Sequence, residues 1–152
     1  MQVFTTVQEI QSFLRTKNTN SIGFVPTMGA LHKAHISLID ISKAENEITI
    51  CSIFVNPKQF NKKEDLVKYP RNTAADLSKL EEANCDVVFI PSIEEMYPLA
   101  VKKEFHFGLL SEVMEAEHRS GHFNGVAIVI ERFFEILAPT NAYFGEKDFQ
   151  QL

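Results

Sequence analysis

Residues 21–55 read SIGFVPTMGALHKAHISLIDISKAENEITICSIFV, and this stretch decides the fold. Its first apolar run, Ser21 to Val25, predicts a buried strand that Pro26 stops. After a turn of small residues, apolar side chains recur at mostly helical spacing from about Ala34 to Ala44, which predicts a helix packed on a sheet. Ile48 to Val55 is a continuous apolar and β-branched run, typical of a strand covered on both faces. Strand, helix and strand in this order indicate a parallel sheet.

The same alternation continues on both sides of this stretch. Thr6 and Glu9 form a capping-box pattern that predicts a first helix. The signals between residues 92 and 123 are weak, and one short strand is expected near Phe105 to Phe107. The remaining predicted elements are a short helix starting at Thr73 and Asp76, a strand over 86–90, a helix over Gly125 to Leu137 and a strand over Ala142 to Gly145. The predicted fold class is therefore α/β: one domain, residues 1–152, with a doubly wound, Rossmann-like parallel sheet whose ligands bind at the carboxyl ends of strands.

Composition limits the classes of function. The chain has 152 residues, with 15 Lys plus Arg against 20 Asp plus Glu, and its formal net charge is −5. An apolar content of 45% supports a globular core and argues against disorder. A net negative charge without a basic cluster argues against nucleic acid as a partner. No apolar stretch reaches the roughly 20 residues of a membrane helix, so no membrane association is expected.

The start of the chain and its two cysteines predict the compartment. The first residues, MQVFTTVQEI, lack the basic and apolar segments of a secretory signal. Cys51 and Cys85 lie in strand-like surroundings without a CxxC pattern, so we expect two free buried thiols. Free thiols are typical of a reducing compartment, and a cytoplasmic location is the prediction.

The segment PTMGALHKAH follows the first predicted strand and enters the helix after it. Unpaired backbone N–H groups and the helix dipole attract anions at such a place, and Gly29 lets the chain approach a ligand closely. His32 and His35 are three apart, so both imidazoles can face one side and stabilise charge that develops on a polyphosphate. From the residues alone, three interpretations stay open: a phosphate site, incidental histidines, or a metal site that His118 and His122 join.

Several ordered motifs resemble one family. PTMGALHKAH closely resembles the histidine motif of the pantothenate synthetases (pantoate–β-alanine ligases), which belong to the nucleotidyltransferase superfamily with the class I aminoacyl-tRNA synthetases. Further segments agree in order with that family: SIFVNPKQF at 52–60, YPR at 69–71, GHFNGV at 121–126 and YFGEKDFQQL at 143–152. The resemblance covers essentially the whole chain.

The chain also departs from the family pattern. Ala34 stands where the family normally has Gly, and Arg119 is followed by Ser120 where the family usually has Pro. Family members continue past the position of Leu152 into a phosphate-binding loop and a smaller carboxyl-terminal domain. The chain is therefore expected to be an amino-terminal fragment that binds substrates without full turnover.

The resemblance implies a ligase reaction and assigns residues to it. ATP and pantoate form pantoyl adenylate and pyrophosphate, usually with Mg²⁺, and β-alanine then displaces AMP to give pantothenate, a coenzyme A precursor. A homodimer is also implied. The implied catalytic residues are His32, His35 and Lys147. The implied ATP-binding residues are Met28, Gly29, His32, His35, Gly145, Lys147 and Asp148. Those implied for pantoate are Pro26, Met28, Gln59 and Gln151, with Asn56 near the amine substrate and Arg119 and Tyr69 as further candidates.

The type of residue implied for pantoate makes chemical sense. A neutral glutamine amide can hold a hydroxyl and a carboxylate without neutralising the charge of the attacking carboxylate. Two other functions stay open. A cytidylyltransferase-like enzyme shares the paired histidines but not the Asn-Pro-x-Gln and Gly-Glu-Lys-Asp segments together, and a nucleotide- and pantoate-binding module would lack useful turnover.

Overall fold

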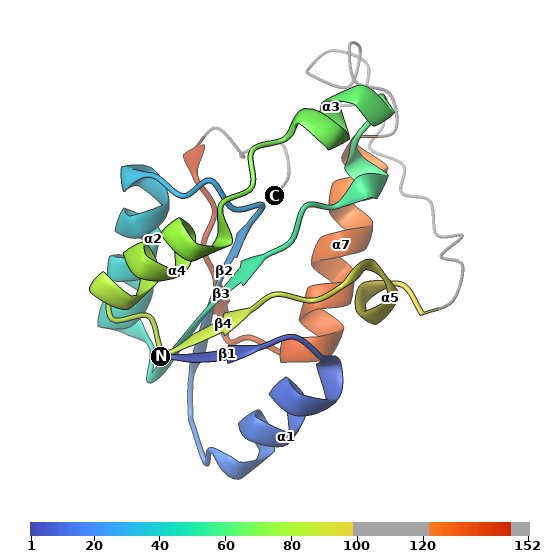
Figure 1. Ribbon diagram of the computed structural model, residues 1–152. Helices are drawn as coiled ribbons and strands as arrows, with labels where there is room; N and C mark the ends of the chain where they lie inside the picture. Colours follow the sequence, from blue (N-terminus) through green and yellow to red (C-terminus); the bar gives the residue numbers. More distant parts are fainter. Residues whose placement is uncertain (99–121, 147–152) are drawn as a thin grey trace.

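A parallel sheet between two layers of helices forms the molecule (Figure 1). The computed structural model describes residues 1–98 and 122–146. Within them the sheet has five strands in the order β1-β4-β3-β2-β5, all parallel, which confirms the predicted fold class. The strands are β1 (Gln2–Phe4), β2 (Ile22–Thr27), β3 (Ile48–Ile53), β4 (Val87–Phe89) and β5 (Asn141–Ala142). The helices are α1 (Val7–Thr16), α2 (Lys33–Glu45), α3 (Lys63–Lys68), α4 (Thr73–Glu82), α5 (Ile93–Met96) and α7 (His122–Leu137), with a 3₁₀ turn, η1, at Pro57–Gln59.

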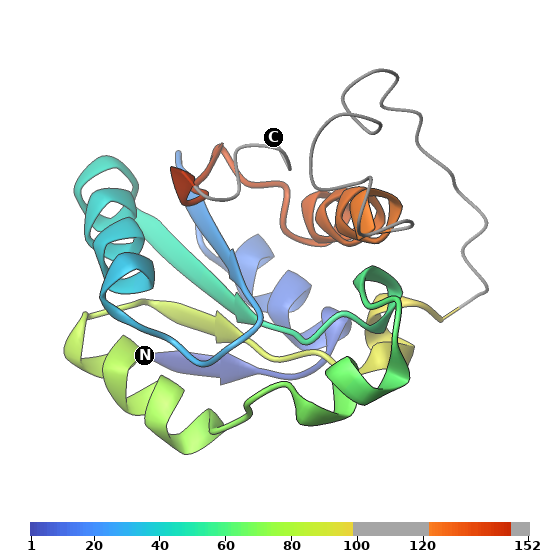
Figure 2. The same ribbon diagram turned by 90° about the horizontal axis from the view of Figure 1, so that it is seen from above.

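Both faces of the sheet are buried. Figure 2 shows α2 and α4 on one side of it and α1 and α7 on the other. Phe24 of β2 packs into the core shared with α1 and α7, whereas its neighbour Val25 packs into the core shared with α2 and α4. Ile50 and Cys51 repeat this alternation in β3, and all four side chains are fully buried. Burial on both sides explains why the strands appear in the sequence as continuous apolar runs.

Pro26 lies inside β2, so the prediction that it stops the strand is wrong. The Thr27 carbonyl accepts a hydrogen bond from Phe54 N at 3.1 Å, on the β3 side of the strand. Because consecutive residues of a parallel strand bond to opposite sides, Pro26 faces the β5 side. Within the described residues β5 pairs with β2 at Gly23 and Phe24, so the missing N–H of Pro26 interrupts no pairing there.

Three short elements of the structure are not predicted from the sequence. β1, α5 and α3 have 3, 4 and 6 residues, which is too short to show a period. β3 and β5 end earlier than predicted, at Ile53 and Ala142. The capping box of Thr6 and Glu9 is present at the start of α1, as predicted. The strand expected near Phe105 to Phe107 lies outside the described residues.

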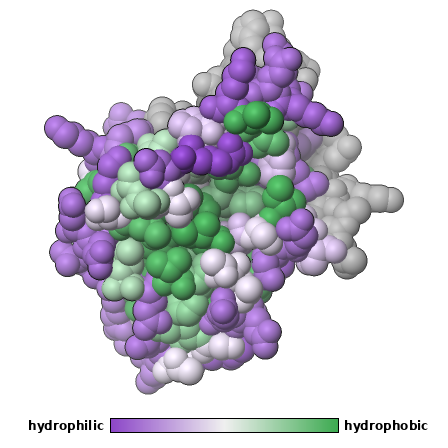
Figure 3. Space-filling model, in the orientation of Figure 1, coloured by the Kyte–Doolittle hydropathy of each residue, from purple (hydrophilic) through white to green (hydrophobic). Residues whose placement is uncertain are grey.

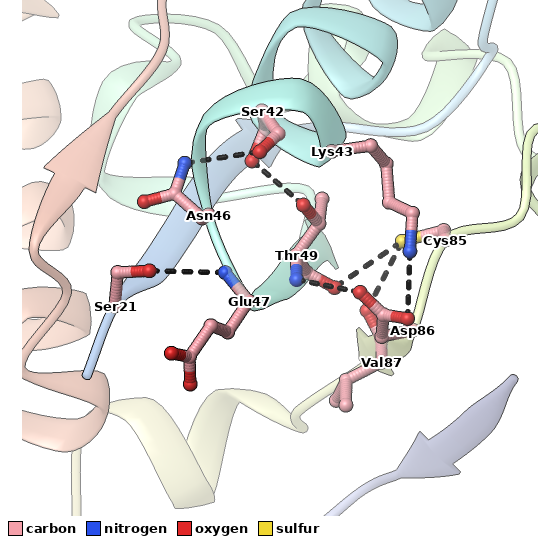
Figure 4. Close-up of polar contacts among 9 residues, drawn as sticks. All are labelled: Ser21, Ser42, Lys43, Asn46, Glu47, Thr49, Cys85, Asp86 and Val87. Carbon is pink, nitrogen blue, oxygen red and sulfur yellow. Dashed lines mark hydrogen bonds and ion pairs between the residues drawn. The ribbon is translucent and has the colours of Figure 1, made fainter. Parts of the chain in front are cut away.

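A polar network ties α2 to the amino ends of β3 and β4 (Figure 4). The hydroxyl oxygens of Ser42 and Thr49 lie 2.8 Å apart, and both residues are fully buried. The Asp86 carboxylate accepts from Lys43 Nζ and from Thr49 N, each at 2.8 Å. The Cys85 thiol donates to the Thr49 carbonyl at 3.6 Å. These bonds fix the position of α2 over the sheet, at the end remote from the β2–α2 loop.

Both cysteines are free and buried, as predicted. Burial raises the pKa of the Cys85 thiol to about 11, because the protein interior disfavours the charged thiolate. Burial likewise raises the pKa of Cys51 well above its ordinary value. The two thiols stay neutral at neutral pH and act as packing groups.

Some hydrophobic side chains reach the surface. Figure 3 shows them gathered in the middle of the face where β1 and β4 lie, with hydrophilic side chains around them. The exposed fraction is 43% for Val3 on the edge strand β1, 50% for Ile93 and 77% for Val67. In the described ranges no helix combines the length and the apolar character needed to cross a membrane.

We predict that Ser42→Ala destabilises the fold because it removes the buried partner of the Thr49 hydroxyl. An unpaired buried polar group costs about 1–3 kcal/mol. The double variant S42A/T49V leaves neither hydroxyl and should lose less than the sum of the two single variants. The measurement is the free energy of unfolding in urea, with Ser37→Ala, an exposed serine of the same helix, as the control. Strict additivity of the two substitutions would contradict the pairing.

Candidate active site

The strand order reverses at β2. From β2 the chain proceeds through β3 to β4, whereas β5 returns to the other side of β2. Ligands of doubly wound sheets bind at the carboxyl ends of the strands beside such a reversal. A cavity of about 310 Å³ opens at this place. Its walls come from the β2–α2 loop, the segment from β3 into η1, helix α7 and Phe144 just after β5.

The β2–α2 loop contains two consecutive left-handed residues. The φ angle is +80° at Gly29 and +52° at Ala30. Glycine adopts this conformation freely, whereas another residue costs about 1–2 kcal/mol there. A Cβ on Gly29 would also lie 3.0 Å from an Asp76 carboxylate oxygen. Both the conformation and the limited space beside it therefore favour glycine at this position.

Internal hydrogen bonds use the backbone N–H groups of this loop. Gly29 N donates to Thr27 Oγ1 at 3.2 Å. Ala30 N and Leu31 N donate to the two carboxylate oxygens of Asp76, at 3.0 and 2.8 Å. The expectation that unpaired N–H groups of this turn attract an anion is thus wrong at these three positions. The reason is the Thr27 hydroxyl for Gly29, and for Ala30 and Leu31 a buried carboxylate that α4 places behind the loop.

His32 and His35 face each other at the amino end of α2. Their ring centroids are 4.1 Å apart, and both rings line the cavity. His32 Nδ1 accepts from Ala34 N, and His35 Nδ1 accepts from His32 N, each at 3.3 Å. Because an accepting Nδ1 carries no proton, each neutral ring carries its proton on Nε2. The donors offered at the cavity are therefore imidazole N–H groups.

Asn56 holds the Gln59 amide in one orientation. Asn56 Oδ1 accepts from the Tyr97 hydroxyl at 2.8 Å and from Lys58 N at 3.2 Å. Asn56 Nδ2 donates to the Gly125 carbonyl at 3.0 Å and to Gln59 Oε1 at 3.1 Å. Gln59 therefore directs its Oε1 toward Asn56 and its Nε2 away from Asn56. Burial raises the pKa of Tyr97, so its hydroxyl remains a donor at neutral pH.

This network also limits what the Asn56 side chain can offer a ligand. The motif match implied that Asn56 stands near an amine substrate. Its side chain is 1% exposed, and its two donors and two acceptor positions all bind protein groups. Asn56 thus lines the cavity beside Gln59 and supports the Gln59 amide, and its role toward an amine substrate stays a prediction.

Helix α7 approaches η1 so closely that one position requires glycine. A Cβ on Gly125 would lie 2.3 Å from the Lys58 carbonyl oxygen. The approach brings Val129 and Phe133 of α7 against Phe54, and these three side chains form an apolar wall of the cavity. The shape of the cavity therefore depends on this contact.

We predict that Gly125→Ala lowers the free energy of unfolding by about 1–3 kcal/mol, because the new methyl group overlaps the Lys58 carbonyl. Helix propensity acts in the opposite direction, since Ala is better than Gly by roughly 1 kcal/mol. Urea unfolding measures the change. Ala127→Gly, in the same turn, should cost only the propensity difference. Higher stability of the Gly125→Ala protein would refute the close approach.

Most of the predicted site residues meet at one cavity. Those that line it are Pro26, Met28, Gly29, His32, His35, Asn56, Gln59 and Tyr69. Gly145 follows the cavity residue Phe144. Lys147, Asp148, Gln151 and Arg119 lie outside the described residues.

Sequence reasoning missed the roles of Asp76 and Tyr97. The sequence pattern indicates only that Asp76 belongs to the start of a helix, and Tyr97 falls in the 92–123 segment, where the signals are weak. Their hydrogen-bond partners Ala30 and Asn56 lie 46 and 41 positions away along the chain. No local spacing could identify these pairs.

The fold and the cavity together define a class of protein. A doubly wound parallel domain with a cavity at the strand reversal, edged by imidazole and amide groups, is typical of the nucleotide-binding α/β class of domains.

Comparisons with known proteins specify the family. The family model described as pantoate-beta-alanine ligase matches residues 2–152, and the chain belongs to this family. It is 51% identical to a pantothenate synthetase of Porphyromonas gingivalis over 154 residues, which cover 100% of this chain and 55% of that protein. It is 56% identical to the pantothenate synthetase of Azobacteroides pseudotrichonymphae, again with 100% and 55% coverage. The chain thus spans about half the length of these relatives.

Solved structures of the same family resemble this chain in fold. The pantothenate synthetase of Thermus thermophilus superimposes with a TM-score of 0.91 at 42% identity, covering 99% of this chain and 54% of that one. The pantoate-beta-alanine ligase of Francisella tularensis, complexed with beta-gamma ATP and beta-alanine, gives 0.91 at 39% identity, covering 99% and 59%. The predicted family is confirmed.

Proposed function

We propose that this chain carries the pantoate- and ATP-binding part of a ligase that joins pantoate to β-alanine. The observation that carries the proposal is the cavity at the strand reversal, where Gln59 and the pair His32 and His35 line one space. The complex of the Francisella relative with beta-gamma ATP and beta-alanine supports two of the three substrates.

The reaction has two steps. A pantoate carboxylate oxygen attacks the α-phosphorus of ATP, and the bond to pyrophosphate breaks. The β-alanine amine then attacks the acyl carbon of the pantoyl adenylate, losing a proton, and AMP leaves to give pantothenate. Chemistry of this kind needs mainly positioning of the reactants and stabilisation of developing charge.

Two imidazoles supply the charge stabilisation in this proposal. The Nε2–H groups of His32 and His35 donate to the phosphate oxygens on which charge grows during attack. Their backbone-held Nδ1 atoms fix the rings beforehand, so little reorganisation is needed in the transition state. The amino end of α2 adds a favourable dipole.

The rest of the cavity suits pantoate. Gln59 is proposed to donate from Nε2 to a pantoate oxygen, with no positive charge to blunt the nucleophile. The apolar wall of Phe54, Val129 and Phe133 fits the quaternary dimethyl carbon of pantoate. Pro26 and Met28 are proposed to complete this pocket.

The segment after β5 is proposed to bind the nucleotide. By motif match, Gly145 and Asp148 contact the ribose, Lys147 the phosphates and Gln151 the pantoate. We propose that Mg²⁺ arrives as the ATP complex, because the phosphate oxygens of a nucleotide are ligands that this ion prefers. In the described ranges no group of three His, Cys, Asp or Glu residues gathers around a metal position.

The proposed reaction has a direct test. Pyrophosphate exchange into ATP should require pantoate alone, and AMP release should require pantoate and β-alanine together. The assay uses the purified protein that contains this chain. Exchange that depends on a nucleotide other than ATP would favour the cytidylyltransferase-like alternative, and pantoate binding without exchange would favour a binding module.

We predict that His32→Ala or His35→Ala lowers the pantoate-dependent exchange rate by roughly 10²–10³-fold, the usual cost of one preorganised donor. Pantoate affinity should change little, because the imidazoles act on charge that develops later. Pyrophosphate-exchange assays and calorimetric pantoate titration measure the two effects. A double variant with near-normal exchange would exclude this role.

We predict that Gln59→Ala weakens pantoate binding by about 1–3 kcal/mol, roughly tenfold to hundredfold, since it removes a buried hydrogen-bond partner. ATP affinity should be unchanged. Calorimetric titration of both ligands checks the split, and Gln8→Ala on α1, exposed and remote from the cavity, is the control. Equal pantoate affinity in variant and parent would refute the assignment.

The family resemblance also supports a homodimer in the cytoplasm. The exposed side chains of Val3, Ile93 and Val67 supply apolar surface that a second copy can cover. Light scattering on the purified protein measures its mass in solution.

A further inference from the structure

Asp76 is a buried carboxylate behind the β2–α2 loop. Its exposed fraction is 2%, and its two oxygens accept from Ala30 N and Leu31 N. One turn further along α4, Lys79 Nζ donates to the Leu31 carbonyl at 2.6 Å. Two side chains of one helix therefore hold three backbone groups of the same turn.

The turn needs such support because it is strained. Gly29 and Ala30 are both left-handed, and Ala30 is not a glycine. A strained conformation of this kind persists only where the surroundings fix it. Hydrogen bonds to a charged group are stronger than bonds between neutral groups, and Asp76 makes two such bonds to the turn where Lys79 makes one.

The held turn ends at His32. Leu31 is fixed by both Asp76 and Lys79, and the next residue is the cap of α2 whose backbone N–H bonds to His35 Nδ1. A displaced turn would move the His32 backbone and with it both imidazoles. The orientation of the histidine pair thus depends on a carboxylate that is absent from the lining of its cavity.

We infer that Asp76, assisted by Lys79, is a positioning residue for adenylation: it acts on the reaction through the turn that places His32 and His35. The inference rests on the proposed function. It identifies α4, which supplies none of the cavity lining, as part of the machinery that sets the adenylation rate.

The test compares Asp76→Asn with Glu82→Gln, a matched change of an exposed carboxylate to an amide on the same helix. The amide introduced by Asp76→Asn offers one acceptor oxygen where the carboxylate offered two, so one loop N–H loses its partner. We expect the pantoate-dependent exchange rate to fall roughly 10²-fold, the cost of a small misplacement of catalytic groups. The KM for pantoate should change less than about threefold, because Gln59 and the apolar wall lie on other elements. Lys79→Met should give a smaller loss in the same direction.

A second measurement separates positioning from general damage. Amide hydrogen exchange on the 152-residue chain should show faster exchange at Ala30 and Leu31 in the Asp76→Asn protein, by roughly tenfold or more. Amides of β3 should keep their protection. Loss of protection throughout the sheet would overturn the inference, as would a pyrophosphate-exchange rate equal to that of Glu82→Gln.

Two further outcomes are decisive. Recovery of the Asp76→Asn rate at high Mg²⁺ would show that Asp76 acts as a metal ligand, which overturns its role through the loop. Absence of pantoate-dependent exchange in the unsubstituted protein would overturn the proposed function and the reaction role of Asp76 with it. The amide measurement needs no catalysis, so it still reports whether Asp76 holds the turn.

Discussion

Hydrogen bonds run from β2 to β3 on one side and to β5 on the other, and the place of the cavity depends on this divergence. Helix α2, which follows β2, covers one face of the sheet, whereas α7, which precedes β5, covers the other, so a space stays open at the strand ends between them. The β2–α2 loop borders this space, and α7 closes its other side through the close contact at Gly125. The loop wall is held by its hydrogen bonds to Asp76, and the α7 wall is held by packing in the core.

The loop meets a second constraint, which is the need of every buried backbone N–H for a partner. In many anion sites these groups stay available for the ligand. Here Thr27 and Asp76 take the N–H groups of Gly29, Ala30 and Leu31. The loop gains a defined shape and gives up those donors. The groups that we propose to bind a ligand at this edge of the cavity are therefore side chains, chiefly the two imidazoles.

Hydrogen bonds to other protein groups also fix the orientation of the Asn56 and Gln59 amides on another wall of the cavity. An amide can present either its oxygen or its nitrogen to a ligand, and the two ends differ little in shape. The Tyr97 hydroxyl and the Lys58 N–H select the orientation of Asn56, and Asn56 in turn selects that of Gln59. A neutral donor is thereby presented without bringing a positive charge into the cavity.

The sequence could be interpreted correctly wherever the cause is local. Continuous apolar runs predicted β2 and β3 because both sheet faces are buried, and the Thr6 and Glu9 pair predicted the start of α1. The motif around His32 and His35 lies after β2, where the structure has a cavity. The prediction that Pro26 ends the strand is wrong because the effect of its missing N–H depends on which neighbouring strand that side of the residue faces. The hydrogen bonds of Asp76 to the β2–α2 loop, and those of Asn56 to Tyr97 and Gly125, likewise depend on partners that only folding brings near. Periodicity and capping act over a few residues, whereas the pairing of buried polar groups is settled when distant segments pack and each donor must find an acceptor.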